Sequence, residues 1–277
     1  MGLTINQGSF PQAAIELYDS GETGNNLWKT IVSPVLLAPN REHLAMVQAE
    51  KFDISQRELA EFCCELNLHF QEESLIFKGQ QTERWYCFAE IPFEVAQVSP
   101  TTIIGENIFP YIPQGDNRRS WQKIFNDCQM LLHHSACNQQ RINAGKPEIN
   151  SLWFWGGGVL PDAYQSNFSQ VMTNDSCVKN MGKLGGATSV PLELEHFSQT
   201  FAPKQGNLIY LDMLQFTEQQ LKQLDENVIA TLRQTVQDRG IEKLHIVIDN
   251  RYLFTVTRKS IRQFWKRKKS LAEFGFS

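Results

Sequence analysis

The stretch that decides the fold is NQQRINAGKPEINSLWFWGGG, residues 138–158. A polar helical segment ends near Gly145, a residue suited to the left-handed conformation that terminates helices, and Pro147 prevents the helix from continuing. SLWFW at 151–155 then predicts a buried strand that runs into three glycines. Two tryptophans at alternate positions of a strand lie on the same face. They indicate either a core or the wall of a binding site.

Three glycines after a strand would allow a phosphate group to approach backbone N–H groups. The sequence continues as Val-Leu-Pro, however, and completes neither G-x-x-x-x-G-K-[ST] nor G-x-G-x-x-G. We therefore favour close packing of the glycines beside Trp153 and Trp155 over a nucleotide-binding loop.

The elements upstream of this stretch come in mixed order. Pro34 interrupts an apolar segment, residues 31–38, and so confines that predicted strand to a sheet edge or a bulge. Ser55 and Glu58 form a capping box that opens a helix. This helix is predicted over 55–70. A second helix is predicted over 120–132, and a hairpin with strands near 74–79 and 84–91 lies between the two helices. The first 28 residues are expected to have little regular structure.

The last third predicts α/β structure. Thr217 and Gln220 can cap a long helix over 217–236. Strands are predicted at 207–211, 244–248 and 252–257. Because alternation of strands and helices is present here but missing from 74 to 112, we predict the mixed α/β class, with helices packed on a mixed sheet.

The charge is unevenly distributed. The chain has 26 Lys and Arg against 30 Asp and Glu, a formal charge of −4, which disfavours non-specific binding of nucleic acid. A basic amphipathic helix is predicted from about Ser260. It either contacts the acidic surface of the protein itself, which we favour, or binds nucleic acid, an anionic membrane surface or a protein partner. The basic residues of this patch are Arg258, Lys259, Arg262, Lys266, Arg267, Lys268 and Lys269.

Other chemistry is sparse. The six cysteines show no metal-ligand spacing, and no H-E-x-x-H or G-x-S-x-G pattern occurs. Glu193, Glu195 and His196 could reach a cation, although chance surface charge is the favoured explanation. No apolar run is long enough to span a membrane and no signal peptide opens the chain, so we expect a soluble cytoplasmic protein.

Residues 138–158 resemble the signature of the archaeal-type, cofactor-independent phosphoglycerate mutases. In that family the signature lies in a domain inserted into an alkaline-phosphatase-like core. The chain is also similar over nearly its full length to bacterial RpfE-type regulatory proteins, through SPVLLAPNREHL, INSLWFWGGG and RQFWKRKKSL. The positions that match the mutase signature are Asn138, Arg141, Gly145, Pro147, Asn150, Trp153, Trp155, Gly156 and Gly158.

The resemblance implies an inserted mutase-like domain plus a small α/β remainder. On this basis we expect an N-terminal segment with an edge strand over 1–46, the mutase-like α/β domain over 47–190, and a C-terminal α/β portion over 191–277 that ends in the basic helix. The mutase reaction needs two Mn²⁺ ions held by Asp and His and a Ser that takes the phosphoryl group. The strand at 207–211 leads only to Asp212, without a following His.

The sequence therefore predicts no catalytic residues, no metal and no cofactor. We expect a non-catalytic regulatory protein that binds a phosphorylated or carboxylated metabolite near Asn138, Arg141 and Asn150, with Arg141 as the bidentate anion donor. A structural role, in which Asn150 satisfies backbone groups of a loop, is equally open. The alternatives are a divergent Mn²⁺-dependent phosphoglycerate mutase or phosphatase, and an interaction module that uses the basic helix. Further residues expected at the ligand site are Trp153, Trp155, Gly156 and Gly158.

Overall fold

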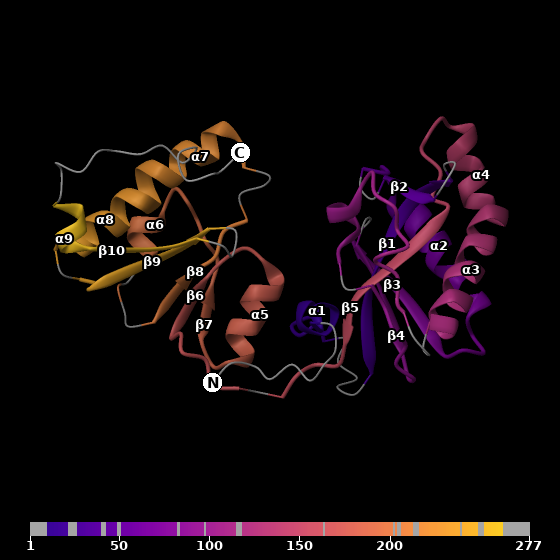
Figure 1. Ribbon diagram of the computed structural model, residues 1–277, viewed down its shortest axis with the longest axis horizontal. Helices are drawn as coiled ribbons and strands as arrows, with labels where there is room; N and C mark the ends of the chain where they lie inside the picture. Colours follow the sequence, from indigo (N-terminus) through magenta and orange to yellow (C-terminus); the bar gives the residue numbers. More distant parts are fainter. Residues whose placement is uncertain are drawn as a thin grey trace. The chain divides into compact units, whose positions relative to one another are not determined.

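The computed structural model confirms the mixed α/β class. The chain divides into two compact units, residues 1–162 (unit 1) and 163–277 (unit 2), both drawn in Figure 1. The sequence predicts boundaries after residues 46 and 190, whereas this division falls between residues 162 and 163. The structure describes residues 10–21, 27–39, 43–48, 51–81, 84–96, 98–114, 118–162, 164–201, 203, 206–212, 216–238, 240–248 and 252–262.

Unit 1 is built on an antiparallel sheet in the order β2-β1-β4-β3, in which β5 also pairs with β1. Strand β1 lies within the first 46 residues and β5 lies within residues 138–158, and the two strands pair in this sheet. The strands are β1 (Trp28–Pro39), β2 (Leu44–Gln48), β3 (Leu75–Gln81), β4 (Arg84–Ala89) and β5 (Ser151–Gly158).

Strand β1 lies inside the sheet, whereas Pro34 predicts a sheet edge or a bulge; its pairing with β2 does shift register between Leu36 and Leu37. It pairs with β4 up to Val32 and with β2 from Leu36 onward, and it also pairs with β5 from Lys29 to Val35. Pro34 therefore falls between the β4 and β2 pairings. Proline lacks a backbone N–H, and this is tolerated at residue 34 because neither the pairing with β4 nor the pairing with β2 includes that residue.

Helices cover both faces of this sheet. Figure 1 shows α2, α3 and α4 on one face and α1, which the sequence did not predict, on the other. Helix α2 begins with the predicted capping box, since Ser55 accepts from the Glu58 N–H and Glu58 accepts from the Ser55 N–H. The unit 1 helices are α1 (Gln12–Glu16), α2 (Gln56–His69), the 3-10 turn η1 (Pro100–Ile103), α3 (Arg118–His134) and α4 (Ala136–Asn143).

The side chains of β5 alternate between two hydrophobic clusters. Leu152 and Phe154 join the cluster beneath α2, α3 and α4, while Trp153 and Trp155 join the cluster that contains Ala13 of α1. This is the alternation expected of a strand buried on both faces. The tryptophan pair thus builds a core.

Unit 2 contains a short parallel sheet in the order β7-β6-β8 and a separate β9-β10 hairpin. The predicted helix over 217–236 is confirmed with its capping box of Thr217 and Gln220, but a π-helical turn, η2, interrupts it. The elements are β6 (Gln170–Met172), α5 (Ser176–Leu184), β7 (Thr188–Val190), α6 (Phe197–Thr200), β8 (Asn207–Ile209), α7 (Glu218–Gln223), η2 (Leu224–Ile229), α8 (Ala230–Gln237), β9 (Lys243–Ile248), β10 (Tyr252–Thr257) and α9 (Arg258–Ile261).

Candidate functional site

Arg141, the expected anion donor, is committed to the interior of unit 1. Only 1% of the residue is exposed. Its Nη1 atom lies 2.7 Å from Glu58 Oε1, Nη2 donates to the Phe52 carbonyl, and both Nε and Nη2 donate to the Pro147 carbonyl. The guanidinium group therefore joins α4 to α2 and to two loops, and it presents no open fork to a bound anion.

The ion pair with Arg141 is coupled to the start of α2. Burial alone would raise the pKa of Glu58, but hydrogen bonds from Ser55 and then from Arg141 outweigh it and lower the pKa to about 2. Lys146 adds a second cationic contact at 3.5 Å from Glu58 Oε2. Glu58 therefore stays ionised across the neutral range and fixes the helix cap and the buried arginine together.

Asn138 and Asn150 each use their amide group as a substitute for a peptide group. Asn138 accepts from the Ile149 N–H and donates to the Ile149 carbonyl at 3.1 and 2.9 Å. Asn150 does the same with the Leu37 backbone, both distances being 2.8 Å. These contacts match the structural role left open for Asn150. The same paired contact joins Asn67 to Phe77 and Asn174 to Leu192.

The expected aromatic wall is likewise occupied by structure. Trp153 Nε1 donates to the Val98 carbonyl and Trp155 Nε1 donates to the Ser33 hydroxyl, both at 3.0 Å. Gly156 has a φ of +61°, where β5 runs one residue longer than β1 between two paired positions. Gly158 lies against Pro11, and a Cβ placed on Gly158 would lie 2.4 Å from Pro11 Cβ. The glycines shape a bulge and accept close packing.

Substitution of Gly157 tests this packing. A Cβ at Gly157 would lie 2.4 Å from Trp28 Cζ2, so we expect Gly157→Ala to lower the free energy of unfolding by about 1–3 kcal/mol. In a Trp28→Phe background, which removes the clashing ring atoms, the cost should be smaller. Urea unfolding of the single and double variants measures both values. An equal cost in the two backgrounds would contradict the assigned contact.

The predicted basic patch is described only at its beginning. Arg258 and Lys259 lie in the four-residue helix α9, and Arg262 follows it. Thr257 and Ser260 cap this helix. Lys266, Arg267, Lys268 and Lys269 lie outside the described residues, so the proposed contact of this patch with a partner or with the acidic surface stays a prediction.

The carboxyl edge of the unit 2 sheet carries the arrangement most suited to a ligand. The chain leaves β6, forms β7 on one side of it and β8 on the other, so the strand order reverses at β6. In open parallel sheets, ligands bind outside the carboxyl ends of the strands at such a reversal. We call the hollow at this edge the sheet-edge hollow. Its lining residues are Asn174, Leu192, Glu193, Leu194, Glu195, His196, Leu211, Phe216, Gln220 and Gln223.

Each of the three strands contributes to the sheet-edge hollow. Asn174 follows β6, residues 192–196 follow β7, and Leu211 follows β8. Helix α7 supplies Gln223, whose Nε2 donates to Glu195 Oε1 at 2.6 Å. The hollow measures about 360 Å³, within the range of sites that hold small molecules. Sequence reasoning noticed Glu193 and Glu195, but only the strand order shows that they meet at a sheet edge.

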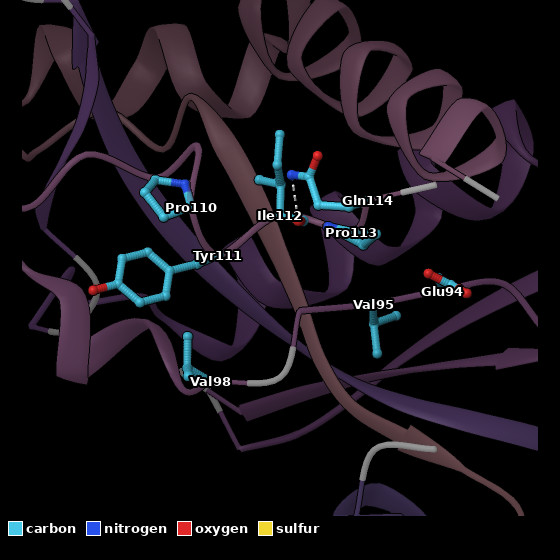
Figure 2. Close-up of a pocket in the computed structure, with 8 residues that line it drawn as sticks. All are labelled: Glu94, Val95, Val98, Pro110, Tyr111, Ile112, Pro113 and Gln114. Atoms are coloured by element: carbon cyan, nitrogen blue, oxygen red, sulfur yellow. Dashed lines mark hydrogen bonds between the residues drawn. The ribbon is translucent and has the colours of Figure 1, made fainter. Parts of the chain in front are cut away.

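A second hollow lies in unit 1 and is shown in Figure 2. It measures about 280 Å³ and lies between Glu94, Val95 and Val98 on one side and residues 110–114 on the other. Gln114 is turned back to donate to the Ile112 carbonyl at 3.0 Å. With its smaller volume and no alignment with strand ends, this hollow is the weaker candidate.

The donors at the sheet edge do not fit a two-metal centre. Within the described ranges, no three His, Cys, Asp or Glu side chains are grouped so that they could hold one ion. Asp175, the carboxylate after β6, caps α5 by accepting from the Val178 N–H at 2.7 Å. Among all the residues that the structure describes, no helix is both long and apolar enough to cross a bilayer.

Comparisons with known proteins relate part of the chain to one enzyme family. No protein-family model matches the chain. A protein of Geobacter sulfurreducens described as a probable 2,3-bisphosphoglycerate-independent phosphoglycerate mutase is 31% identical over 64 residues, 23% of this chain and 16% of that protein. The corresponding mutase of Methanosarcina mazei is 32% identical over 62 residues, 22% of this chain and 16% of the mutase. The matched stretch thus spans about a sixth of these relatives.

Among solved structures, the cofactor-independent phosphoglycerate mutase of Thermoplasma acidophilum aligns with 89% of this chain and 71% of its own, at 12% identity and a TM-score of 0.44. A Pyrococcus horikoshii protein aligns with 83% of this chain and 60% of its own, at 13% identity and a TM-score of 0.48. The sequence matches establish a partial relationship to the cofactor-independent phosphoglycerate mutases.

Proposed function

We propose that this chain is a non-catalytic, cytoplasmic regulatory relative of the cofactor-independent phosphoglycerate mutases, which binds a small molecule in the sheet-edge hollow. The observation that carries the proposal is the position of that hollow at the reversal of strand order. Regulation by ligand binding accords with the resemblance to RpfE-type proteins. The cytoplasmic placement is supported by the six cysteines, all of which are free thiols.

The groups at the sheet edge support binding over turnover. Asn174 is held by the Leu192 backbone, Asp175 caps α5, and Glu195 accepts from Gln223. These polar groups stabilise the edge itself. A metal-assisted phosphoryl transfer needs carboxylates and imidazoles that are free to hold ions.

The expected metabolite site around Arg141 is replaced in this proposal. Arg141, Asn138 and Asn150 make their hydrogen bonds to protein groups, so an anion there would have to displace contacts that hold unit 1 together. A ligand in unit 2 meets a hollow already formed. The polar side chains of residues 138–158 are therefore assigned to stabilising the fold.

Activity measurements test the non-catalytic assignment. With 2- or 3-phosphoglycerate and added Mn²⁺, we expect no interconversion and no phosphate release above the rate in buffer. The chain should also bind no stoichiometric Mn²⁺ in a metal analysis after gel filtration. Turnover that scales with protein concentration and disappears with a chelator would establish the alternative, a divergent metal-dependent mutase or phosphatase.

A further inference from the structure

We propose that the sheet-edge hollow selects an organic cation with an apolar arm, such as a primary amine on an aromatic or aliphatic body. The inference rests on the proposed function, which places the ligand in this hollow, and adds the chemical class of that ligand. It differs from the phosphorylated or carboxylated metabolite that the sequence suggested.

The charge of the lining is the first reason. Among the described residues that line the hollow are Glu193 and Glu195, and none of those residues is a Lys or an Arg. Glu193 makes no hydrogen bond or ion pair with any described residue, so its carboxylate is available to a ligand. Two further carboxylates lie at the same edge, since Asp175 follows β6 and Asp212 follows β8. Burial raises the pKa of Tyr210, and the negative charges of these two carboxylates raise it further. A cation is favoured in this field.

The helix that could attract an anion is already capped. The N-terminus of α5 follows β6 at this edge, and such a terminus can bind phosphate or carboxylate groups. Here the side chain of Asp175 accepts from the Val178 N–H and occupies that position. An anionic ligand at this helix terminus would therefore meet the negative charge of Asp175.

The floor of the hollow determines the rest of the ligand. Leu192 is buried with 4% exposure, and Leu194 and Leu211 pack against the core of unit 2. Phe216 adds an aromatic face, which attracts cations as well as apolar groups. Apolar walls disfavour a hydrated metal ion, whereas an amine can place its ammonium group at Glu193 and its arm on the leucines.

A matched pair of probes tests the inference in calorimetric titrations of the full chain at low salt. 2-Phenylethylamine and 3-phenylpropionate share an arm of similar size and carry opposite charges. We expect the amine to bind at least tenfold more tightly than the carboxylate. The double variant Glu193→Gln/Glu195→Gln should lose at least tenfold in affinity for the amine, and added salt should weaken binding by the parent chain.

Two controls separate the hollow from general surface charge. Glu226→Gln changes an exposed carboxylate on η2 that pairs with Lys222 and does not line the hollow, so amine affinity should stay within twofold. Gln223→Trp places an indole in the hollow from α7 and should abolish binding. Melting temperatures of all variants verify that they fold.

The outcomes distinguish the two proposals. Equal binding of both probes, with loss of both in Gln223→Trp, would overturn the choice of a cation and leave the ligand site in place. Binding that is unaffected by Gln223→Trp, or no binding of the amine at all, would overturn the inference that this hollow takes an organic cation. Turnover of phosphoglycerate would instead refute the non-catalytic function.

Discussion

Asn138→Asp is expected to lower the free energy of unfolding of unit 1 by about 3–5 kcal/mol, the cost of an uncompensated buried charge. Asn138 is 1% exposed, and its Nδ2 donates to the carbonyls of Leu132 and Ile149 at 3.1 and 2.9 Å. A carboxylate would direct a negative oxygen at both carbonyls. For a unit of this size the melting temperature should fall by roughly 10 °C.

The exposed residue Asn143, at the end of the same helix, supplies a matched control. Asn143→Asp should cost less than about 1 kcal/mol, since it adds only a surface charge near a helix C-terminus. The penalty at Asn138 should also shrink as the pH falls, because a protonated carboxyl group can again donate to one carbonyl. Thermal unfolding at pH 7 and pH 4 measures both effects. Similar melting temperatures for the two variants would contradict the contacts assigned to Asn138.

Arg141→Met should produce a loss of similar size, about 3–5 kcal/mol, because it leaves Glu58 without its buried partner. It also removes the donors that serve the Phe52 and Pro147 carbonyls. Arg57→Met is the control, since Arg57 pairs with Glu61 on the exposed side of α2 and exposed pairs contribute about 0–1 kcal/mol. Urea unfolding at pH 7 distinguishes the two. A change below 1 kcal/mol in Arg141→Met would refute the structural role.

The same variant changes the pH dependence of stability. The pKa of Glu58 is about 2 in the folded chain, below its ordinary value of 4.5. Its contribution is therefore fully present above about pH 5 and is lost as the pH falls toward 2. In Arg141→Met the folded pKa moves back toward the ordinary value, so stability should fall less steeply over this interval. Urea midpoints at pH 7, 5 and 3 measure the slope.

Local signals explain the elements that the sequence predicted. The capping boxes at Ser55 and Thr217 lie where α2 and α7 begin, and Gly145 adopts the left-handed conformation just after α4, at a φ of +73°. These features depend on residues within one turn of each other. The hairpin strands β3 and β4, and likewise β9 and β10, follow from two short runs rich in apolar and β-branched residues on either side of a polar segment.

The missed elements depend on distant contacts. Strands β6 and β7 contain three residues each, which is too short for a period to be recognised. Helix α1 has five residues, and Ala13 and Ile15 are buried by the sheet that it covers. Strand β1 passes through the sheet interior despite Pro34 because its partners change at that residue. None of this is encoded in neighbouring residues.

The role of the predicted site residues could not be read from their chemistry. An arginine fork and an asparagine amide offer the same donors to a bound anion and to a backbone carbonyl. Only the fold shows that Arg141 meets Pro147 and that Asn150 meets Leu37. Conversely, Glu193 and Glu195 are visible in the sequence, but the reversal of strand order that makes their neighbourhood a hollow is a property of topology.

The paired asparagine contacts also bear on self-association. Two outer strands of the unit 1 sheet, β3 and β5, have edges whose backbone groups could pair with a strand from another molecule. The amide of Asn67 occupies the outer edge of β3 at Phe77, and the Ala96 N–H donates to the Phe154 carbonyl on the outer edge of β5. A foreign strand would find each edge interrupted near its middle. Asn67 and Ala96 thus occupy backbone groups that edge-to-edge addition of a strand would need.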